Sequence, residues 1–183
     1  YPWMEWTAEK KLTVMRMNRL QKHWEFLTVA TKSGKSISGL SESDEAGWVG
    51  LHRNYKFLKN GNIVWMSERS GWHHLYIHTA AGELVQQITD GEWEVKKIIH
   101  LDEENEIVYF TANKASVFET RFYSVNFDGT NLKLLTKEKG SHSIKVLPKG
   151  NAFIDSYSSI QTPTKHILKN MDGNVRMVLD ETD

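Results

Sequence analysis

A unit of about 45 residues recurs four times along the chain, and every copy contains a strand-like run, a turn at a glycine and a short closing strand. The turn glycines lie 48, 47 and 44 residues apart, and the dipeptides that end the closing strands are separated by the same steps. These landmarks are Gly34, Gly82, Gly129 and Gly173, and Leu40-Ser41, Ile88-Thr89, Leu135-Thr136 and Leu179-Asp180. Two landmarks that recur together indicate a structural repeat, and a period of this size built from strands is typical of β-propeller blades.

Each unit contains four runs rich in β-branched and aromatic residues, a pattern that predicts β-strands. The second run of a unit is the most apolar, as at residues 63–67, 107–111 and 152–156. No segment carries a long helical period. We therefore predict an all-β fold, a β-propeller fragment of about four four-stranded antiparallel blades in one segment. The expected blades cover about residues 1–42, 43–89, 90–136 and 137–183.

The composition excludes several classes of partner and chemistry. The 183 residues include 23 Lys and Arg and 23 Asp and Glu, so no net charge attracts nucleic acid or an anionic membrane. Because the chain has no cysteine, it has no disulfide, thiolate zinc site or cysteine nucleophile. No apolar stretch approaches the length of about 18 residues that predicts a membrane span. The first residues lack the basic end and apolar core of a signal peptide.

Two familiar catalytic motifs are incomplete or missing. Residues 29–36 end like a phosphate-binding P-loop, but Val29 replaces the first glycine and the segment lies in a hairpin of the repeat. The Gly-x-Ser-x-Gly elbow of α/β-hydrolase serine enzymes does not occur. The sequence therefore predicts neither a nucleotide site nor a catalytic triad within this chain.

Two residue pairs could bind a cation. His73 and His74 are adjacent on a predicted strand, so they point to opposite faces and cannot easily share a metal ion. One packed and one solvated histidine is the favoured interpretation. Glu92 and Glu94 would project to one side, where they could hold a cation or a substrate amine, although such a pair is more often a solvated loop face. We predict no cofactor and no metal site.

The seven tryptophans exceed what a surface requires and indicate aromatic packing between blades. We expect Trp6 and Trp65 to lie in the core. Trp72 and Trp93 follow turn glycines, where a structural clamp between neighbouring strands is favoured over a platform for sugars.

Three segments in order resemble the propeller of the dipeptidyl peptidase IV family. They are Gly-Trp-Val-Gly at residues 47–50, Ser-Glu-Arg-Ser-Gly-Trp-His-His-Leu-Tyr at 67–76 and Thr-Asp-Gly-Glu-Trp-Glu-Val at 89–95. The resemblance continues at residues 109–113 and 155–159 and covers nearly the whole chain. Members of this family are serine peptidases that remove dipeptides, usually ending in proline or alanine, from polypeptide N-termini.

The resemblance implies that this segment is part of an eight-bladed propeller, roughly its last four blades. An α/β-hydrolase domain that carries the Ser, Asp and His of the triad would follow in the parent chain, so we expect the segment alone to be inactive. The paired glutamates that bind the substrate amine in this family would come from an earlier blade, and that role is not transferred to Glu92 or Glu94. The sequence resembles the bacterial members, which implies a periplasmic, cell-envelope or secreted parent protein.

The resemblance also implies one substrate-binding element. The residues after the Gly-Trp-Val-Gly motif border the pocket for the substrate residue two before the cut, and these positions hold His52 and Arg53. Arg53 matches the family pattern and could hydrogen bond a peptide carbonyl through its fixed fork of donors. His52 replaces the aromatic residue of the family. An exposed arginine at a blade edge is an equally good interpretation of Arg53.

Two functions from different classes remain at this stage. The first is the propeller portion of a dipeptidyl peptidase IV-like serine exopeptidase, which walls the active-site cavity and controls the entry of peptides with a free N-terminus. The second is a free-standing propeller that binds peptide or glycan. Because half a ring would leave two apolar blade faces bare, we also expect self-association, such as a homodimer of two halves.

Overall fold

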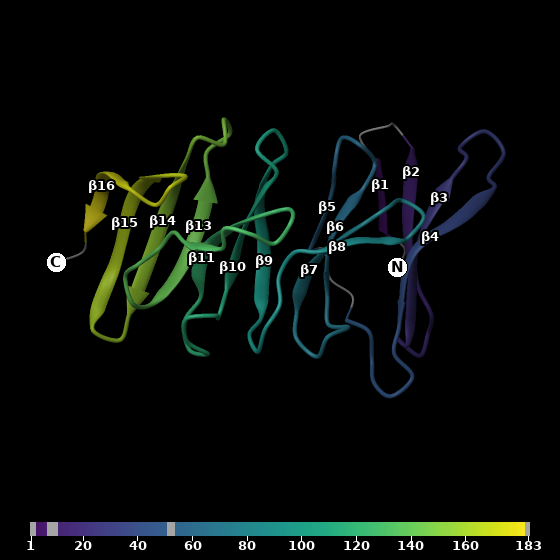
Figure 1. Cartoon of the computed structure of the whole chain (residues 1–183), viewed down its shortest axis with the longest axis horizontal. Helices are drawn as coiled ribbons and strands as arrows, with labels where there is room; N and C mark the ends of the chain where they lie inside the picture. The colour runs from purple at the N-terminus through teal and green to yellow at the C-terminus, as the bar shows by residue number, and fades with distance from the viewer. Residues whose placement is uncertain (1–2, 7–10, 51–53, 182–183) are drawn as a thin grey trace. The chain divides into compact units, whose positions relative to one another are not determined.

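The computed structural model describes residues 3–6, 11–50 and 54–181, and within them all regular structure is β-strand (Figure 1). The strands form four antiparallel sheets of four strands, each built from strands consecutive in the sequence. This arrangement confirms the predicted all-β fold. The strands are β1 (Trp3–Trp6), β2 (Leu12–Met17), β3 (His23–Val29), β4 (Ser36–Ser43), β5 (Tyr55–Phe57), β6 (Ile63–Ser67), β7 (His74–His78), β8 (Leu84–Gln87), β9 (Val95–Asp102), β10 (Ile107–Ala112), β11 (Arg121–Asn126), β12 (Lys133–Leu134), β13 (Ser141–Val146), β14 (Ala152–Ser159), β15 (Thr162–Asn170) and β16 (Val175–Glu181).

The chain divides into two compact units. The first unit consists of Tyr1–Trp65 and Tyr76–Gln86, and the second of Met66–Leu75 and Gln87–Asp183. The sheet formed by β5 to β8 supplies residues to both units, whereas each of the other three sheets lies within one unit.

An aromatic cluster forms the core of the first unit. Trp24 on β3 and Trp65 on β6 are fully buried, and their ring centroids lie 4.3 Å apart. The indole N–H of Trp65 donates a hydrogen bond to Glu42 at 3.1 Å, which satisfies its polar atom in the core. Phe26 meets Trp65 edge to face. The prediction of a core position for Trp65 is therefore confirmed.

Trp6, by contrast, was expected in the core and is 61% exposed. Side chains on a strand alternate between faces, so Trp6 shares a face of β1 with Met4, which is also exposed. The opposite face of β1 carries Trp3, which packs against the aromatic core. The prediction for Trp6 was wrong because composition alone does not reveal which face of an edge strand is covered.

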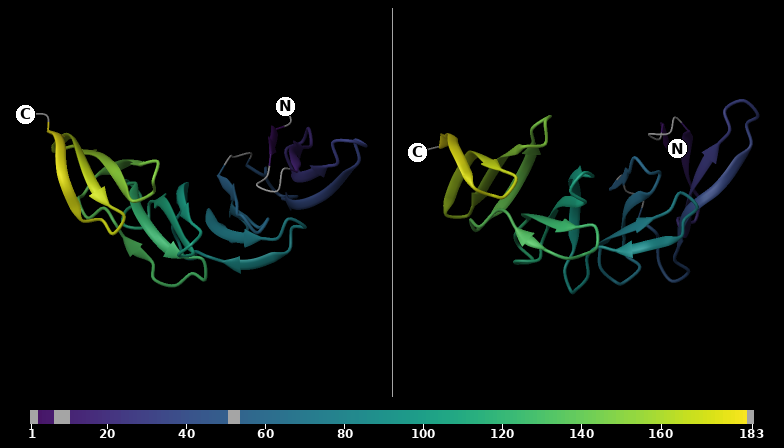
Figure 2. Two further views of the ribbon diagram at one scale, coloured as in Figure 1. Left: turned by 90° about the horizontal axis from the view of Figure 1, so that it is seen from above. Right: turned by 45° about the horizontal axis from the view of Figure 1, so that its top comes forward.

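The second unit packs the β9–β12 sheet against the β13–β16 sheet, which lie beside each other in Figure 2. Phe122 and Phe153 are fully buried between them, with ring centroids 4.8 Å apart. Trp93 is 7% exposed and packs between Phe110 and His74, in agreement with its predicted role as a clamp. Trp72 remains 39% exposed.

The two landmarks of the sequence repeat touch each other in successive repeats. All four turn glycines have positive φ, between 70° and 92°. In the first unit, a Cβ at Gly82 would lie 3.0 Å from the Cα of Leu40. In the second unit, a Cβ would lie 3.0 Å from the Ile88 carbonyl oxygen at Gly129, and 2.5 Å from that of Leu135 at Gly173. At Gly82, Gly129 and Gly173, glycine is therefore required both by the turn and by close backbone contact with the preceding closing strand.

The closing dipeptide has its own explanation in the second unit. Ile88 and Leu135 are buried, and each bonds through its backbone N–H to the carbonyl of a residue on the third strand. The hydroxyl oxygens of Thr89 and Thr136 then accept the backbone N–H of Leu75 and Phe122 at 2.9 and 3.0 Å. The apolar residue fills the core and the threonine satisfies a buried donor, which accounts for the recurrence of this pair.

Candidate functional site

The predicted substrate-binding residues His52 and Arg53 lie outside the described residues, so their roles stay predictions. The described positions on either side are well anchored. Val49 packs against the aromatic core of the first unit and donates its backbone N–H to the Gln21 carbonyl at 2.8 Å. On the other side, β5 begins at Tyr55, which pairs with Trp65 on β6.

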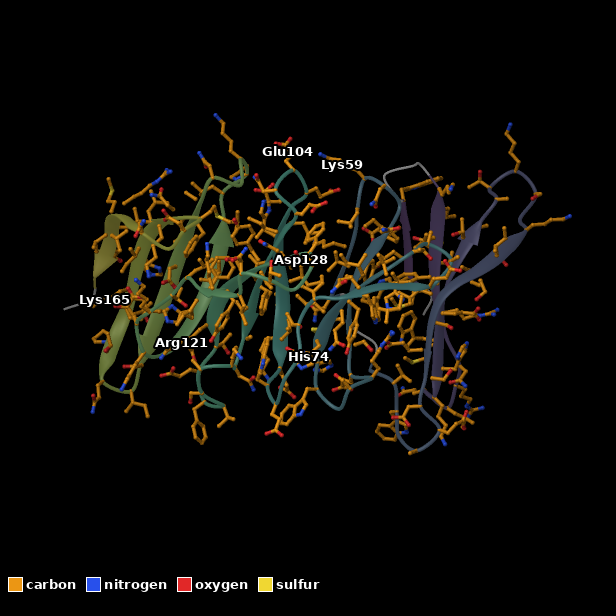
Figure 3. The ribbon with its side chains drawn as sticks, in the orientation of Figure 1. Lys59, His74, Glu104, Arg121, Asp128 and Lys165 are labelled. Carbon is orange, nitrogen blue, oxygen red and sulfur yellow. The ribbon has the colours of Figure 1, made fainter. Side chains whose placement is uncertain are left out.

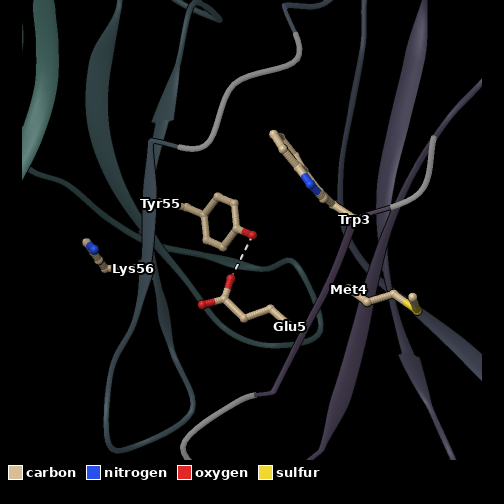
Figure 4. Close-up of a pocket in the computed structure, with 5 residues that line it drawn as sticks. All are labelled: Trp3, Met4, Glu5, Tyr55 and Lys56. Carbon is tan, nitrogen blue, oxygen red and sulfur yellow. Dashed lines mark hydrogen bonds between the residues drawn. The ribbon is translucent and has the colours of Figure 1, made fainter.

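A pocket of about 340 Å³ opens beside Tyr55 in the first unit (Figure 4). Two edge strands line it: β1 contributes Trp3, Met4 and Glu5, and β5 contributes Tyr55 and Lys56. The Tyr55 hydroxyl donates a hydrogen bond to the Glu5 carboxylate at 2.8 Å, across a separation of 50 residues in the sequence. The sequence analysis missed this pocket, because neither residue belongs to a local motif.

The local structure explains how these side chains meet. Trp3 and Glu5 are two residues apart on β1, so both point to the same face of the strand. The backbone carbonyl of Glu5 accepts the Thr13 hydroxyl at 3.0 Å, which ties β1 to β2 at this position. The ring of Tyr55 stacks on Trp65, with centroids 5.7 Å apart. Tyr55 is thus held by the core while its hydroxyl reaches the pocket.

The two adjacent histidines point apart, as predicted. His74 at the start of β7 is buried, and its Nε2 lies 2.8 Å from the Gly91 carbonyl oxygen (Figure 3). A carbonyl accepts only, so Nε2 carries the proton, and Nδ1 can accept from the Thr89 hydroxyl at 3.1 Å. His73 is part-exposed and lies 3.1 Å from Glu68. These two histidines therefore do not form a shared metal site.

Glu92 and Glu94 do not act as a pair in the structure. Glu94 is hydrogen bonded to the Lys96 ammonium, and this contact lowers the pKa of the Glu94 carboxyl below its ordinary value. Glu92 is exposed. The solvated interpretation of this pair is therefore favoured over a bound amine.

The second unit contains a buried cluster of charged side chains that the sequence analysis also missed. Asp155 on β14 is fully buried and lies between His142 of β13 and Lys169 of β15. Its Oδ1 is 2.8 Å from His142 Nδ1 and its Oδ2 is 3.0 Å from Lys169 Nζ. Lys169 also contacts Glu138 at 2.8 Å. A useful signal was available, because an aspartate in an otherwise apolar second strand requires charged partners.

Hydrogen-bond partners fix the orientation of the His142 ring. Its Nδ1 faces the Asp155 carboxylate, and its Nε2 lies 2.9 Å from the Glu138 carbonyl oxygen. Both ring nitrogens of His142 therefore have an oxygen partner within hydrogen-bond distance. Burial opposes charge on Lys169, but its hydrogen bonds to Glu138 and Asp155 outweigh this and raise the pKa of Lys169. Burial likewise acts to raise the pKa of Glu138, and contact with Lys169 lowers it overall.

Comparison with known proteins identifies the family. The family model described as the dipeptidyl peptidase IV (DPP IV) N-terminal region matches residues 1–164. The chain belongs to the dipeptidyl peptidase IV family. The resemblance found in the three motifs is thereby confirmed.

Individual relatives agree with this assignment. Dipeptidyl peptidase 4 of Trichophyton rubrum is 27% identical over 162 residues, which are 85% of this chain and 21% of the relative. The crystal structure of Porphyromonas gingivalis dipeptidyl peptidase 4 matches with a TM-score of 0.86 and 25% identity, over 93% of this chain and 24% of that one. A Bacteroides ovatus structure at 21% identity and TM-score 0.82 covers 99% of this chain and 29% of that one, and supports the fold alone.

The four sheets are therefore blades of a partial β-propeller, as predicted. The chain spans about a fifth of the length of the curated relative from Trichophyton rubrum. No helix among the described residues has the length and hydropathy needed to cross a membrane.

Proposed function

We propose that this chain is the propeller portion of a dipeptidyl peptidase IV-like serine exopeptidase. It walls the active-site cavity and restricts entry to flexible peptides with a free N-terminus. The observation that carries this proposal is the match of the family's N-terminal region over residues 1–164. The relatives are named as dipeptidyl peptidases, and each is several times longer than the segment that matches this chain.

In this proposal the chemistry resides elsewhere in the parent protein. The sequence lacks the nucleophile elbow, so the triad is supplied by an α/β-hydrolase domain of the same parent chain. The segment alone is inactive, and its four blades cover about residues 1–42, 43–89, 90–136 and 137–183. The parent protein acts in the periplasm, the cell envelope or outside the cell.

Arg53 is proposed to border the substrate pocket, with His52 beside it. The support is their position two and three residues after Gly-Trp-Val-Gly, in a short stretch with anchored residues on both sides. A guanidinium that donates to a substrate carbonyl contributes a charge-assisted hydrogen bond of about 1.5–3 kcal/mol, or roughly 10- to 150-fold in rate.

The test is steady-state kinetics of the parent enzyme on peptides with a penultimate proline. Arg53→Ala should lower kcat/KM by at least about tenfold. Lys59→Ala, at the exposed tip of the β5–β6 hairpin, is the matched control and should leave kcat/KM unchanged (Figure 3). An unchanged kcat/KM for Arg53→Ala would show that Arg53 does not contact the substrate, which would contradict the proposal.

We further propose that the isolated chain self-associates through bare blade faces. The last strand, β16, supports this, because Val175, Met177 and Leu179 are 56%, 58% and 46% exposed. Apolar side chains gathered on one strand favour burial against a second copy. Light scattering that gives the mass of a monomer at high concentration would count against this proposal.

A further inference from the structure

We propose that the pocket between β1 and β5 binds the cationic side chain of a peptide, arginine or lysine. The carboxylate of this site comes from Glu5. The choice of a peptide as the source of the cation rests on the proposed peptidase function. The choice of a cation rests on the chemistry of the pocket itself.

The charge of the pocket points to a cation. Tyr55 donates its hydroxyl to Oε2 of Glu5 at 2.8 Å, and this bond fixes the direction of the Glu5 carboxyl group. Among the described residues, the second oxygen, Oε1, accepts no hydrogen bond, and Glu5 is one of the side chains that line the pocket (Figure 4). An aligned carboxylate with a free oxygen is a receptor for an ammonium or guanidinium group.

Lys56 lines the same pocket but does not neutralise it. It follows Tyr55 on β5, and adjacent residues on a strand point to opposite faces. Figure 4 shows its ammonium directed away from the Glu5 carboxylate. The carboxylate therefore remains available, and Lys56 contributes to the rim.

The walls of the pocket favour a long basic side chain over a small inorganic ion. Trp3 and Tyr55 present aromatic rings beside the carboxylate, and a cation near such rings gains about 0.5–2 kcal/mol. Tyr55 keeps its orientation because it contacts Trp65 and Phe26 in the core. The apolar stem of arginine or lysine can lie along these rings while the charged end meets Glu5.

The size of the pocket agrees with this occupant. A volume of about 340 Å³ lies at the lower end of the range of about 300–1,000 Å³ for ligand sites. This space holds one extended side chain and excludes a folded partner. Arginine should bind better than lysine, because its planar fork matches a carboxylate.

The test measures binding to the chain by isothermal titration calorimetry or ligand-observed NMR. The probe is N-acetyl-arginine amide, and its neutral isostere N-acetyl-citrulline amide is the matched control ligand. We expect the arginine probe to bind at least about tenfold more tightly than the citrulline probe at low salt. Glu5→Gln should abolish this preference, and Tyr55→Phe should reduce it.

Glu83→Gln is the matched control variant. Glu83 is an exposed glutamate next to the β7–β8 turn of the same unit and does not line the pocket. Its loss should leave the preference for arginine intact. Circular dichroism and the urea midpoint of each variant establish that the fold is retained. A loss of binding is then due to the changed side chain in the pocket and not to unfolding.

Three results would overturn the proposal. They are equal binding of the arginine and citrulline probes, an unaltered preference in a folded Glu5→Gln variant, and a free diamine that binds tenfold more tightly than the arginine probe. Because the assay measures binding without catalysis, its outcome is independent of whether the parent protein is a peptidase.

Discussion

At the scale of single residues, the second unit is held together by charges that depend on one another. Asp155 is fully buried and lies between His142 on one side and Lys169 on the other. Removing one member of a buried ion pair typically costs about 3–5 kcal/mol, because the remaining charge loses its partner. These side chains come from three neighbouring strands and therefore fix the register of the β13–β16 sheet.

Glu138 makes this cluster sensitive to acid. The pKa of Glu138 in the folded chain lies below its ordinary value of 4.5. Burial acts to raise this pKa, but the contact with Lys169 lowers it by more. A lowered pKa gives stability that is fully present above pH 4.5 and is lost as pH falls through the folded pKa. Lys169 has a raised pKa, so its contribution persists at neutral pH and is lost only above its ordinary value of 10.5.

We therefore predict that Glu138→Gln lowers the free energy of unfolding at pH 7, and that the difference from the unmodified chain shrinks on acidification below about pH 4.5. Urea unfolding monitored by tryptophan fluorescence between pH 3 and pH 7 measures this difference. Glu104→Gln, at the tip of the β9–β10 hairpin, is the control and should change little (Figure 3). If the difference in free energy of unfolding between Glu138→Gln and the unmodified chain stays constant with pH, Glu138 does not contribute to the loss of stability in acid.

At the scale of elements, the recurring contact between a turn glycine and the preceding closing strand explains why the repeat is so regular. A side chain at Gly173 would meet the Leu135 carbonyl oxygen at 2.5 Å, in a backbone conformation with φ of 88°. Gly34 has a similar φ of 70°, but a Cβ there meets nothing within 4 Å. A substitution at Gly34 therefore measures the destabilisation caused by the turn conformation alone, and one at Gly173 measures that of the turn and the backbone contact together.

Gly173→Ala should therefore destabilise the chain more than Gly34→Ala. The turn conformation alone costs about 1 kcal/mol for alanine, and displacement of the backbone contact adds to it. The urea midpoints of the two variants measure the difference. Equal losses for both would show that the contact with Leu135 contributes nothing beyond the turn.

Sequence patterns predict the strands well, because alternation and turn glycines are local signals. The expected strand at 63–67 coincides with β6. Those at 107–111 and 152–156 begin where β10 and β14 begin and end one and three residues before them. Contacts between distant residues were not predicted. The pair of Glu5 and Tyr55 depends on how two edge strands meet, and the burial of Asp155 depends on three strands. Trp6 was misplaced for the same reason.

At the scale of the whole molecule, a propeller does not determine a function, because unrelated activities share the fold. The family match over residues 1–164 limits the choice to one class of parent protein. Within that class, we propose that the chain supplies walls and pocket edges and that the bond-breaking groups lie elsewhere in the parent protein.

The most direct test is the release of p-nitroaniline from Gly-Pro-p-nitroanilide, measured in parallel for the purified 183-residue chain and for the parent protein. We predict rapid release by the parent protein and none above background by the chain alone. Turnover by the chain alone, or no turnover by a folded parent protein, would contradict the account.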